Sequence, residues 1–339
     1  MIVISKIRLS SLFTLLLCNL ILSLASSSTI SLPYYNLSCP FEWARYSCIY
    51  KNSSNSQESN NYYKSKHQFD IKESLINLTN RTILLVGDSI TRQLFISISC
   101  LTIKNIRFNY VDWMYWPCYQ DLNHCISSGL HSGFNIGYIE WLNGGKLYFQ
   151  SLGGGYRYFE SNIIKRFANE LNKFRYIHSH EPTFKFPNNN ISSPILSKSD
   201  VIIINLGFHQ DDINSFKIKL FEFIEVGKQI LKYHNESTPY LVYMTSSTQH
   251  FNKNGTYLGL NNDNNFCINE SLHNPRKELE EKYLIEGESI HKIVDFDDMK
   301  LGNLHIGGND CTHYCMPGLP DIKAELLFNE LHHLLISNK

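Results

Sequence analysis

Short apolar runs alternate with helical periodicity along most of this chain. Three runs consist almost entirely of aliphatic and aromatic residues, as expected of strands buried on both faces: 83–86, 201–204 and 240–244. Three further segments also read as strands: 105–111, 146–151 and 290–296. Apolar spacing, or a charged stretch opened by proline, predicts these helices: 90–100, 216–233, 275–287 and 321–336. The alternation predicts an α/β fold, a three-layer sandwich with a parallel sheet between helices.

The first 25 residues differ from the rest. Lys6 and Arg8 precede an apolar run over 9–24, and Ser23 and Ala25 supply the small residues that a signal peptidase reads. We interpret 1–25 as a signal peptide and 26–339 as a single domain, because no low-complexity linker divides it. The alternative is an uncleaved membrane anchor, although sixteen residues interrupted by Ser, Thr and Asn are short for a span.

Charge excludes two classes of partner. The chain has 31 basic and 31 acidic residues, and loss of Lys6 and Arg8 with the leader leaves 29 against 31, a net charge of −2. A near-neutral chain is not expected to bind nucleic acid or an anionic membrane surface.

Cysteines and glycosylation motifs fit the secretory pathway. The leader takes Cys18, and an even set remains: Cys39, Cys48, Cys100, Cys118, Cys125, Cys267, Cys311 and Cys315. Four disulfides are the simplest interpretation. The alternative is a metal site of Cys311, His313 and Cys315. We do not favour it, since neighbouring thiols in a secreted chain are more often oxidised. Asn-x-Ser/Thr motifs occur at Asn36, Asn52, Asn77, Asn80, Asn190, Asn235, Asn254 and Asn269.

The stretch 81–100 is typical of a buried strand, a tight turn and a helix. Gly87, Asp88 and Ser89 form the turn, which puts Ser89 at the amino end of the helix, where backbone N–H groups and the positive helix end favour an oxyanion. Ser89 is therefore a candidate nucleophile. Alternatively, the three residues only make a capped turn.

A second stretch, 309–318, carries the groups that would activate a serine. Asp310 and His313 lie three residues apart on what reads as a tight loop. A histidine can take the serine proton, and a carboxylate can fix its tautomer and stabilise its cation. Ser89, His313 and Asp310 are thus a candidate catalytic triad.

The two stretches resemble the GDS and DxxH blocks of the SGNH/GDSL hydrolase superfamily. More narrowly, DCTHYCMPGLPD at 310–321 is similar to the DCxHWCLPGxPD ending of the PC-esterase family with its trichome-birefringence-like polysaccharide O-acetyltransferases. CPF at 39–41, NLGFH at 205–209 and TSSTQHF at 245–251 resemble further family segments. Thr248 replaces the proline of the last segment, which leaves the role of His250 open.

The resemblance implies a flavodoxin-like parallel sheet and an oxyanion hole. The backbone N–H of Ser89 and the side chain of Asn205 would donate to the oxyanion, with a third donor among Gly153, Gly154 and Gly155, of which we take Gly154. For Asn205, a simple turn after the strand at 201–204 is the alternative.

The resemblance also implies acetyl transfer to a glycan or polysaccharide hydroxyl, in the Golgi lumen or after secretion. The acetyl donor is not identified by the sequence, and no cofactor or metal is expected. The same groups acting with water would make a carbohydrate acetylesterase. A non-catalytic glycan-binding protein is a third alternative, in which Trp113 and Trp116 stack on sugars.

The family pattern also suggests disulfides. It pairs Cys267 with Cys311 and Cys48 with Cys315, and so ties both sides of His313. Cys39 would then join Cys100, at the end of the helix that Ser89 begins. This leaves Cys118 and Cys125 for an extra bridge outside the family pattern.

Overall fold

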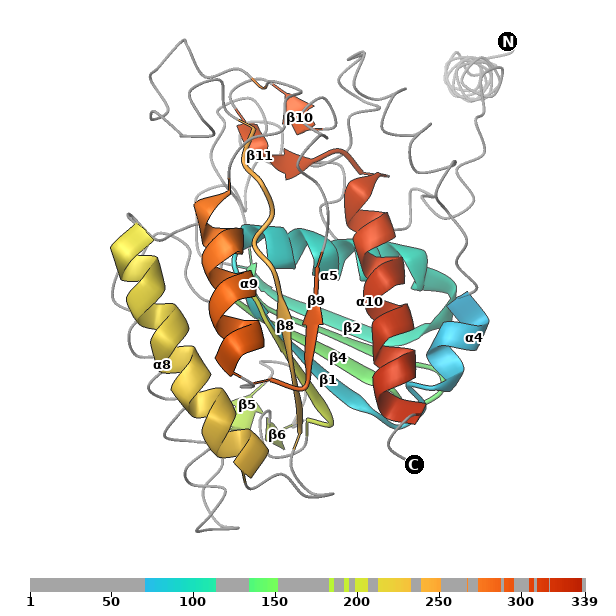
Figure 1. Ribbon diagram of the computed structural model, residues 1–339. Coiled ribbons are helices and arrows are strands. Elements are labelled where there is room, and N and C mark those ends of the chain that lie inside the picture. The colour runs from blue at the N-terminus through green and yellow to red at the C-terminus, as the bar shows by residue number, and fades with distance from the viewer. Residues whose placement is uncertain are drawn as a thin grey trace, which may run out of the picture. The chain divides into compact units, whose positions relative to one another are not determined.

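The computed structural model places a sheet among helices (Figure 1). It describes residues 71–113, 134–151, 183–185, 192–194, 199–206, 213–232, 239–250, 267, 274–287, 290–295, 305–307, 310–316 and 318–336. The helices are α4 (Ile71–Ile76), α5 (Ser89–Leu101), the short 3₁₀ helix η3 (Ile103–Asn105), α8 (Ile213–Lys232), α9 (Pro275–Gly287) and α10 (Leu319–Ile336).

Seven strands form one mixed sheet. In spatial order they are β2 (Ile106–Trp113), β3 (Phe134–Trp141), β4 (Lys146–Ser151), β1 (Thr82–Gly87), β7 (Val201–Ile204), β8 (Tyr240–Met244) and β9 (Lys292–Val294). From β4 to β9 the neighbours are parallel. Two separate pairs are β5 (Thr183–Lys185) with β6 (Ser192–Pro194), and β10 (His305–Gly307) with β11 (Asp310–Tyr314).

Alternate side chains of the central strands pack against different helices. On one face, Leu84 and Ile202 join a core with Phe216 and Phe223 of α8 and Leu284 of α9. On the other face, Phe95 of α5 lies 5.8 Å from Phe149 of β4, and Trp141 of β3 lies 6.1 Å from Phe328 of α10, both between ring centroids. Because both faces are covered, β1, β7 and β8 are almost completely buried, as their unbroken apolar sequences predict.

The sheet differs from the predicted one in a single strand. The α/β class is confirmed, but β3 runs antiparallel to both β2 and β4, so the sheet is mixed. The strand β3 was not among the predicted elements. The short turn over 142–145 connects it to β4, which allows antiparallel pairing only.

The predicted elements otherwise recur with small shifts at their ends. The Ser89 helix begins one residue before the periodic stretch, the last helix begins at Leu319 rather than 321, and the last strand of the sheet is confined to Lys292–Val294. No helix within the described ranges is long and apolar enough to cross a membrane. The leader at 1–25 lies outside those ranges.

Candidate active site

Ser89 lies at the first position of α5, and only Asp88 separates it from the carboxyl end of β1. Asp88 caps the helix, because its Oδ1 accepts a hydrogen bond from the backbone N–H of Ile90 at 2.9 Å. A side chain at Gly87 would have its Cβ 2.0 Å from Oγ1 of Thr91, so glycine is required for the helix to approach the strand this closely. The strand, turn and helix are thus as the sequence predicts, the cap of the alternative interpretation is also present, and Ser89 is partly exposed beside the helix N-terminus.

Asp310 and His313 are bonded to one another. The ring Nδ1 of His313 lies 2.8 Å from Oδ2 and 3.1 Å from Oδ1 of Asp310. Oδ1 also accepts hydrogen bonds from the backbone N–H groups of His313 and Thr312, at 2.9 and 3.1 Å. Because Nδ1 is directed at the carboxylate, Nε2 is the ring nitrogen that can accept the proton of a hydroxyl group.

Electrostatics favour the ionised form of Asp310. Burial by itself raises the pKa of this carboxyl, but the charge of His313, the hydrogen bond from its ring and the two backbone N–H groups together hold the pKa well below its ordinary value. A carboxylate that stays ionised can stabilise a histidine cation during proton transfer.

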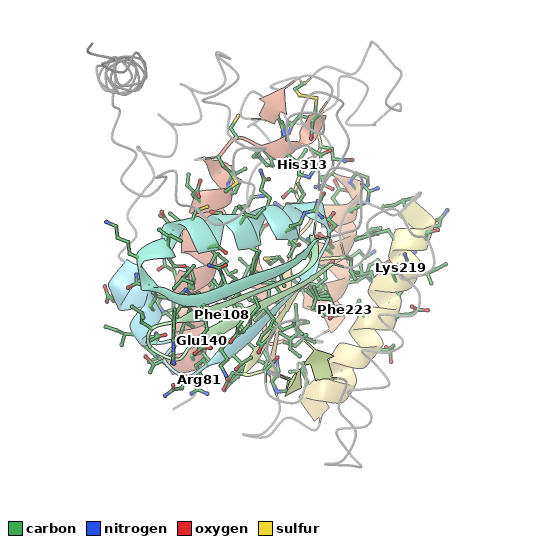
Figure 2. The ribbon with its side chains drawn as sticks, turned by 180° about the vertical axis from the view of Figure 1, so that it is seen from behind. Arg81, Phe108, Glu140, Lys219, Phe223 and His313 are labelled. Atoms are coloured by element: carbon green, nitrogen blue, oxygen red, sulfur yellow. A yellow bond between two sulfur atoms is a disulfide. The ribbon has the colours of Figure 1, made fainter. Side chains whose placement is uncertain are left out.

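The segment that carries this pair is a strand rather than the expected tight loop. Asp310–Tyr314 is β11, which pairs antiparallel with β10, with an irregularity in register between His305 and Gly307. The local fold brings Asp310 to His313 through the two backbone hydrogen bonds to Oδ1. Figure 2 shows His313 at the end of the sheet far from Arg81, which precedes β1.

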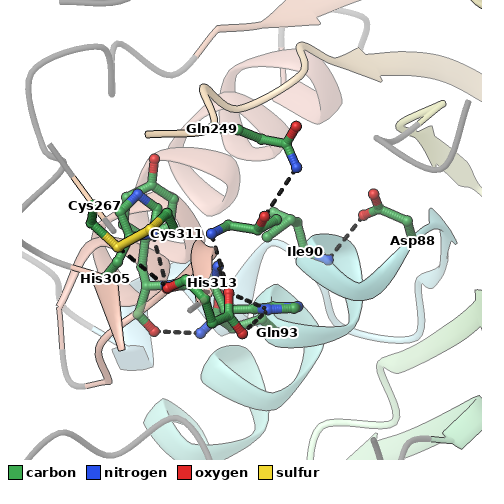
Figure 3. Close-up of polar contacts among 11 residues, drawn as sticks. Asp88, Ile90, Gln93, Gln249, Cys267, His305, Cys311 and His313 are labelled. Carbon is green, nitrogen blue, oxygen red and sulfur yellow. Dashed lines mark hydrogen bonds and ion pairs between the residues drawn. A yellow bond between two sulfur atoms is a disulfide. The ribbon is translucent and has the colours of Figure 1, made fainter. Parts of the chain in front are cut away.

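Gln93 joins α5 to β11, and sequence reasoning missed it. One turn after Ser89, its Nε2 donates to the carbonyl oxygen of Tyr314 at 2.6 Å, and its Oε1 accepts from the Tyr314 N–H at 3.3 Å (Figure 3). Gln93 is almost fully buried, so both bonds are shielded from water. The described connection between Ser89 and His313 is therefore indirect, through Gln93 and Tyr314.

A second bond ties the same helix to the start of α10. Ser97 donates to Oδ1 of Asp321 at 2.5 Å, and Oδ2 of Asp321 accepts from the N–H of Gly318 at 2.6 Å. Both polar side chains are fully buried. Polar residues within a helix that packs against the sheet, such as Gln93 and Ser97, are the sequence signal that could have identified these contacts.

Asn205 follows β7, at the same edge of the sheet as Ser89. Its backbone N–H donates to Val86 at 2.9 Å, and its Nδ2 donates to the carbonyl oxygens of Met244 and Thr245 at 2.9 and 3.2 Å. These bonds hold the ends of β7 and β8 together and engage the amide nitrogen of Asn205. The oxyanion role of Asn205 stays a prediction, and Gly154 lies outside the described residues.

A small cavity lies between the first turn of α5 and the ends of β7 and β8. Its volume is about 20 Å³, and its lining includes Thr91, Asn205, Ser247 and Lys323. This is about the space of one water molecule, so a sugar ring does not fit in it. Lys323, almost fully buried, donates to Oγ of Ser247 at 2.5 Å.

One predicted disulfide lies within the described residues. Cys267 is bonded to Cys311, with Cα atoms 5.2 Å apart, so one side of β11 is covalently held. Cys100 and Cys315 are each part of a further disulfide. Their expected partners, Cys39 and Cys48, lie outside the described ranges, as do Cys118 and Cys125. With Cys311 and Cys315 in disulfides, neither sulfur is a thiolate for a metal, and no cluster of metal-binding side chains occurs in the described part of the chain.

Two of the eight predicted glycosylation motifs lie within the described residues. Asn80 is exposed in a turn with a positive φ of 57°. Asn77 is partly buried, and its Nδ2 contacts the backbone oxygen of Glu73 at 3.3 Å and the ring Nδ1 of His332. The remaining motifs, and Trp116, lie outside the described residues; Trp113 ends β2.

Neither the family models nor the curated proteins with which the sequence was compared match this chain.

Proposed function

We propose that the protein transfers acyl groups, specifically acetyl, to or from glycan hydroxyls, and that it acts as a polysaccharide O-acetyltransferase. The observation that carries this proposal is the bonded pair of Asp310 and His313 on a strand that Gln93 ties to the Ser89 helix. The sequence resemblance to the PC-esterase family suggests that the transferred group is acetyl and that the acceptor is a glycan. It also supports a three-layer sandwich of the SGNH type and a location in the secretory pathway.

The first half of the reaction transfers acetyl to the enzyme. Nε2 of His313 takes the Ser89 hydroxyl proton while Oγ attacks the acetyl carbonyl carbon, and Asp310 stabilises the resulting imidazolium. The oxyanion accepts from backbone N–H groups at the start of α5, and from Asn205 once one of its bonds to Met244 or Thr245 is released. The imidazolium then returns the proton to the leaving oxygen as the ester forms on Ser89.

The second half repeats these steps with a new nucleophile. A glycan hydroxyl gives its proton to His313 and attacks the Ser89 ester, and the serine leaves with that proton. When water is the nucleophile, the product is acetate and the protein is an acetylesterase. The ratio of transfer to hydrolysis therefore depends on whether the acceptor site excludes water.

Labelling with a fluorophosphonate probe tests the proposal, because the probe reacts with activated serines. We expect labelling at Ser89 in the wild type and a loss of at least about 10³-fold in the Ser89→Ala and His313→Gln variants. Ser99→Ala is a matched control on the same helix, since the Ser99 hydroxyl donates to the Phe95 carbonyl within α5 at 2.7 Å. Labelling at another serine, or full labelling in Ser89→Ala, would refute the mechanism.

A labelled acetyl ester, p-nitrophenyl acetate, then separates the alternatives. Transfer of label to added xylan or pectin oligosaccharides indicates a transferase, and release of acetate alone indicates an esterase. Glycan binding that persists in Ser89→Ala, with no probe labelling in the wild type, would favour a non-catalytic binding protein.

A further inference from the structure

Two buried histidines lie behind the strand that carries His313. His305 begins β10, and His250 lies in the segment that follows β8; both are 0 % exposed. Nδ1 of His250 lies 2.7 Å from Nε2 of His305, and Nδ1 of His305 lies 2.9 Å from the backbone oxygen of His313. The two rings therefore connect the segment after β8 to the main chain of the candidate base.

The geometry fixes where the protons lie. A carbonyl oxygen only accepts, so Nδ1 of His305 carries a hydrogen and donates it to His313. One proton fits between Nε2 of His305 and Nδ1 of His250, and when both rings are neutral it belongs to His250. One proton added to the pair leaves this arrangement intact, whereas a second would put two N–H groups face to face.

Neighbouring groups hold the His305 ring in this orientation. Tyr314 stacks on it with ring centroids 4.2 Å apart and planes inclined by 26°. The Tyr314 hydroxyl donates to the carbonyl oxygen of Thr248 at 3.2 Å. The backbone N–H of His250 donates to the carbonyl oxygen of Cys311 at 3.1 Å. The segment 248–250 and β11 are thus joined by main-chain and ring contacts together.

We infer that His250 and His305 are positioning residues for His313: their hydrogen-bonded rings fix its backbone carbonyl and thereby the direction of its imidazole. The inference rests on the proposed function, because it assigns the pair to the general base of that reaction. A displacement of the base by about 1 Å costs roughly 100-fold in rate, so a bond at this position has a measurable effect on turnover.

Two amide substitutions at His305 separate its two nitrogens. His305→Asn keeps an N–H near the position of Nδ1, and can still donate to His313. His305→Gln places its amide near Nε2 and loses that donation. With p-nitrophenyl acetate we expect kcat to fall by less than about tenfold in the asparagine variant and by about 100-fold in the glutamine variant, with KM unchanged in both. Equal losses in two variants that melt at the same temperature, or no loss in either, would overturn the inference.

A spectroscopic measurement tests the pair without reference to activity. In the full chain labelled with ¹⁵N-histidine, both His250 and His305 should show a hydrogen on Nδ1, with slow exchange because both are buried. His250→Gln should remove one signal, keep the other and reduce kcat less than His305→Gln does. A hydrogen on Nε2 of His305 with none on its Nδ1 would refute the arrangement, even if no His305 variant folds. If the wild type is inactive while both Nδ1 hydrogens are present, the proposed reaction fails and the positioning role fails with it, but the histidine pair stands.

Discussion

Replacement of Glu280 by glutamine is expected to change how the stability of the protein depends on pH. Glu280 lies on α9 and is fully buried; its Oε1 accepts from the Tyr243 hydroxyl at 2.7 Å and the Ser246 hydroxyl at 2.6 Å, and its Oε2 accepts from the Ser246 N–H at 2.7 Å. Burial raises the pKa of Glu280 to about 7, although these bonds and the charge of Arg276 oppose the increase.

The sign and size of this pH dependence follow from the number of protons bound by the folded and unfolded states. Between pH 4.5, where the unfolded chain releases this proton, and about pH 7, the folded protein still holds it. The free energy of unfolding therefore falls as the pH rises through this window, by about 3 kcal/mol in total at about 1.4 kcal/mol for each pH unit. Glu280→Gln resembles the protonated acid and lacks this contribution, so relative to the wild type it gains about 3 kcal/mol between pH 4.5 and pH 8.

Urea unfolding at pH 4.5, 6, 7 and 8, followed by tryptophan fluorescence, measures the difference. Comparison of the two proteins at each pH cancels the titration of every other group. Glu280→Leu is the contrast, because it leaves the donors on Tyr243 and Ser246 without an acceptor and should lose stability at every pH. A difference between wild type and Glu280→Gln that stays constant from pH 4.5 to pH 8 would show that Glu280 is ionised throughout and would refute the reasoning.

Three further changes test the site. Asp310→Asn should reduce kcat by about 10³ to 10⁴-fold. Because the pKa of Asp310 is lowered in the folded state, the wild type loses stability as pH falls below about 4, and the variant should lack this pH-dependent contribution. Equal acid unfolding profiles of the two proteins would contradict this. Gln93→Met keeps the side-chain volume but removes both buried hydrogen bonds to the backbone of Tyr314, so urea unfolding should show a loss of about 2–4 kcal/mol. Probe labelling should also be slower, and unchanged labelling would show that the link to Ser89 is unimportant. Cys267→Ala opens a bridge across 44 residues, which should cost about 4 kcal/mol in the chain-entropy model; a loss below about 1 kcal/mol would indicate that neighbouring contacts already hold β11.

Elements defined by local sequence were predicted well. The run at 83–86 with its Gly-Asp-Ser turn, and the run at 201–204, are buried on both faces and need no information from elsewhere in the chain. The strand Phe134–Trp141 was missed because its identity comes from pairing with β2 and β4. The segment 310–314 was expected to be a loop for the same reason, since its partner β10 gives it an extended conformation.

The residues of the candidate site likewise fall into those that local sequence predicts and those that depend on distant parts of the chain. Asp310 and His313 were found because a spacing of three residues lets a carboxylate reach an imidazole within one segment. Gln93 acts on a backbone 221 residues away, and His305 acts on His313 through a hairpin that the sequence did not predict. Contacts from a side chain to a distant main chain leave no spacing rule in the sequence, because any residue can supply the backbone group.

The hairpin of β10 and β11 stands outside the seven-stranded sheet, which has a consequence for inactivation. Ser89 begins α5, whose stability comes from the main core, whereas His313 is held by side-chain hydrogen bonds, by the rings of His250 and His305 and by disulfides. The hairpin can therefore open in a sub-global event that leaves the sheet folded. A reducing agent would then abolish the proposed acyl transfer before circular dichroism detects unfolding, and the protein would recover that activity on reoxidation without refolding its core.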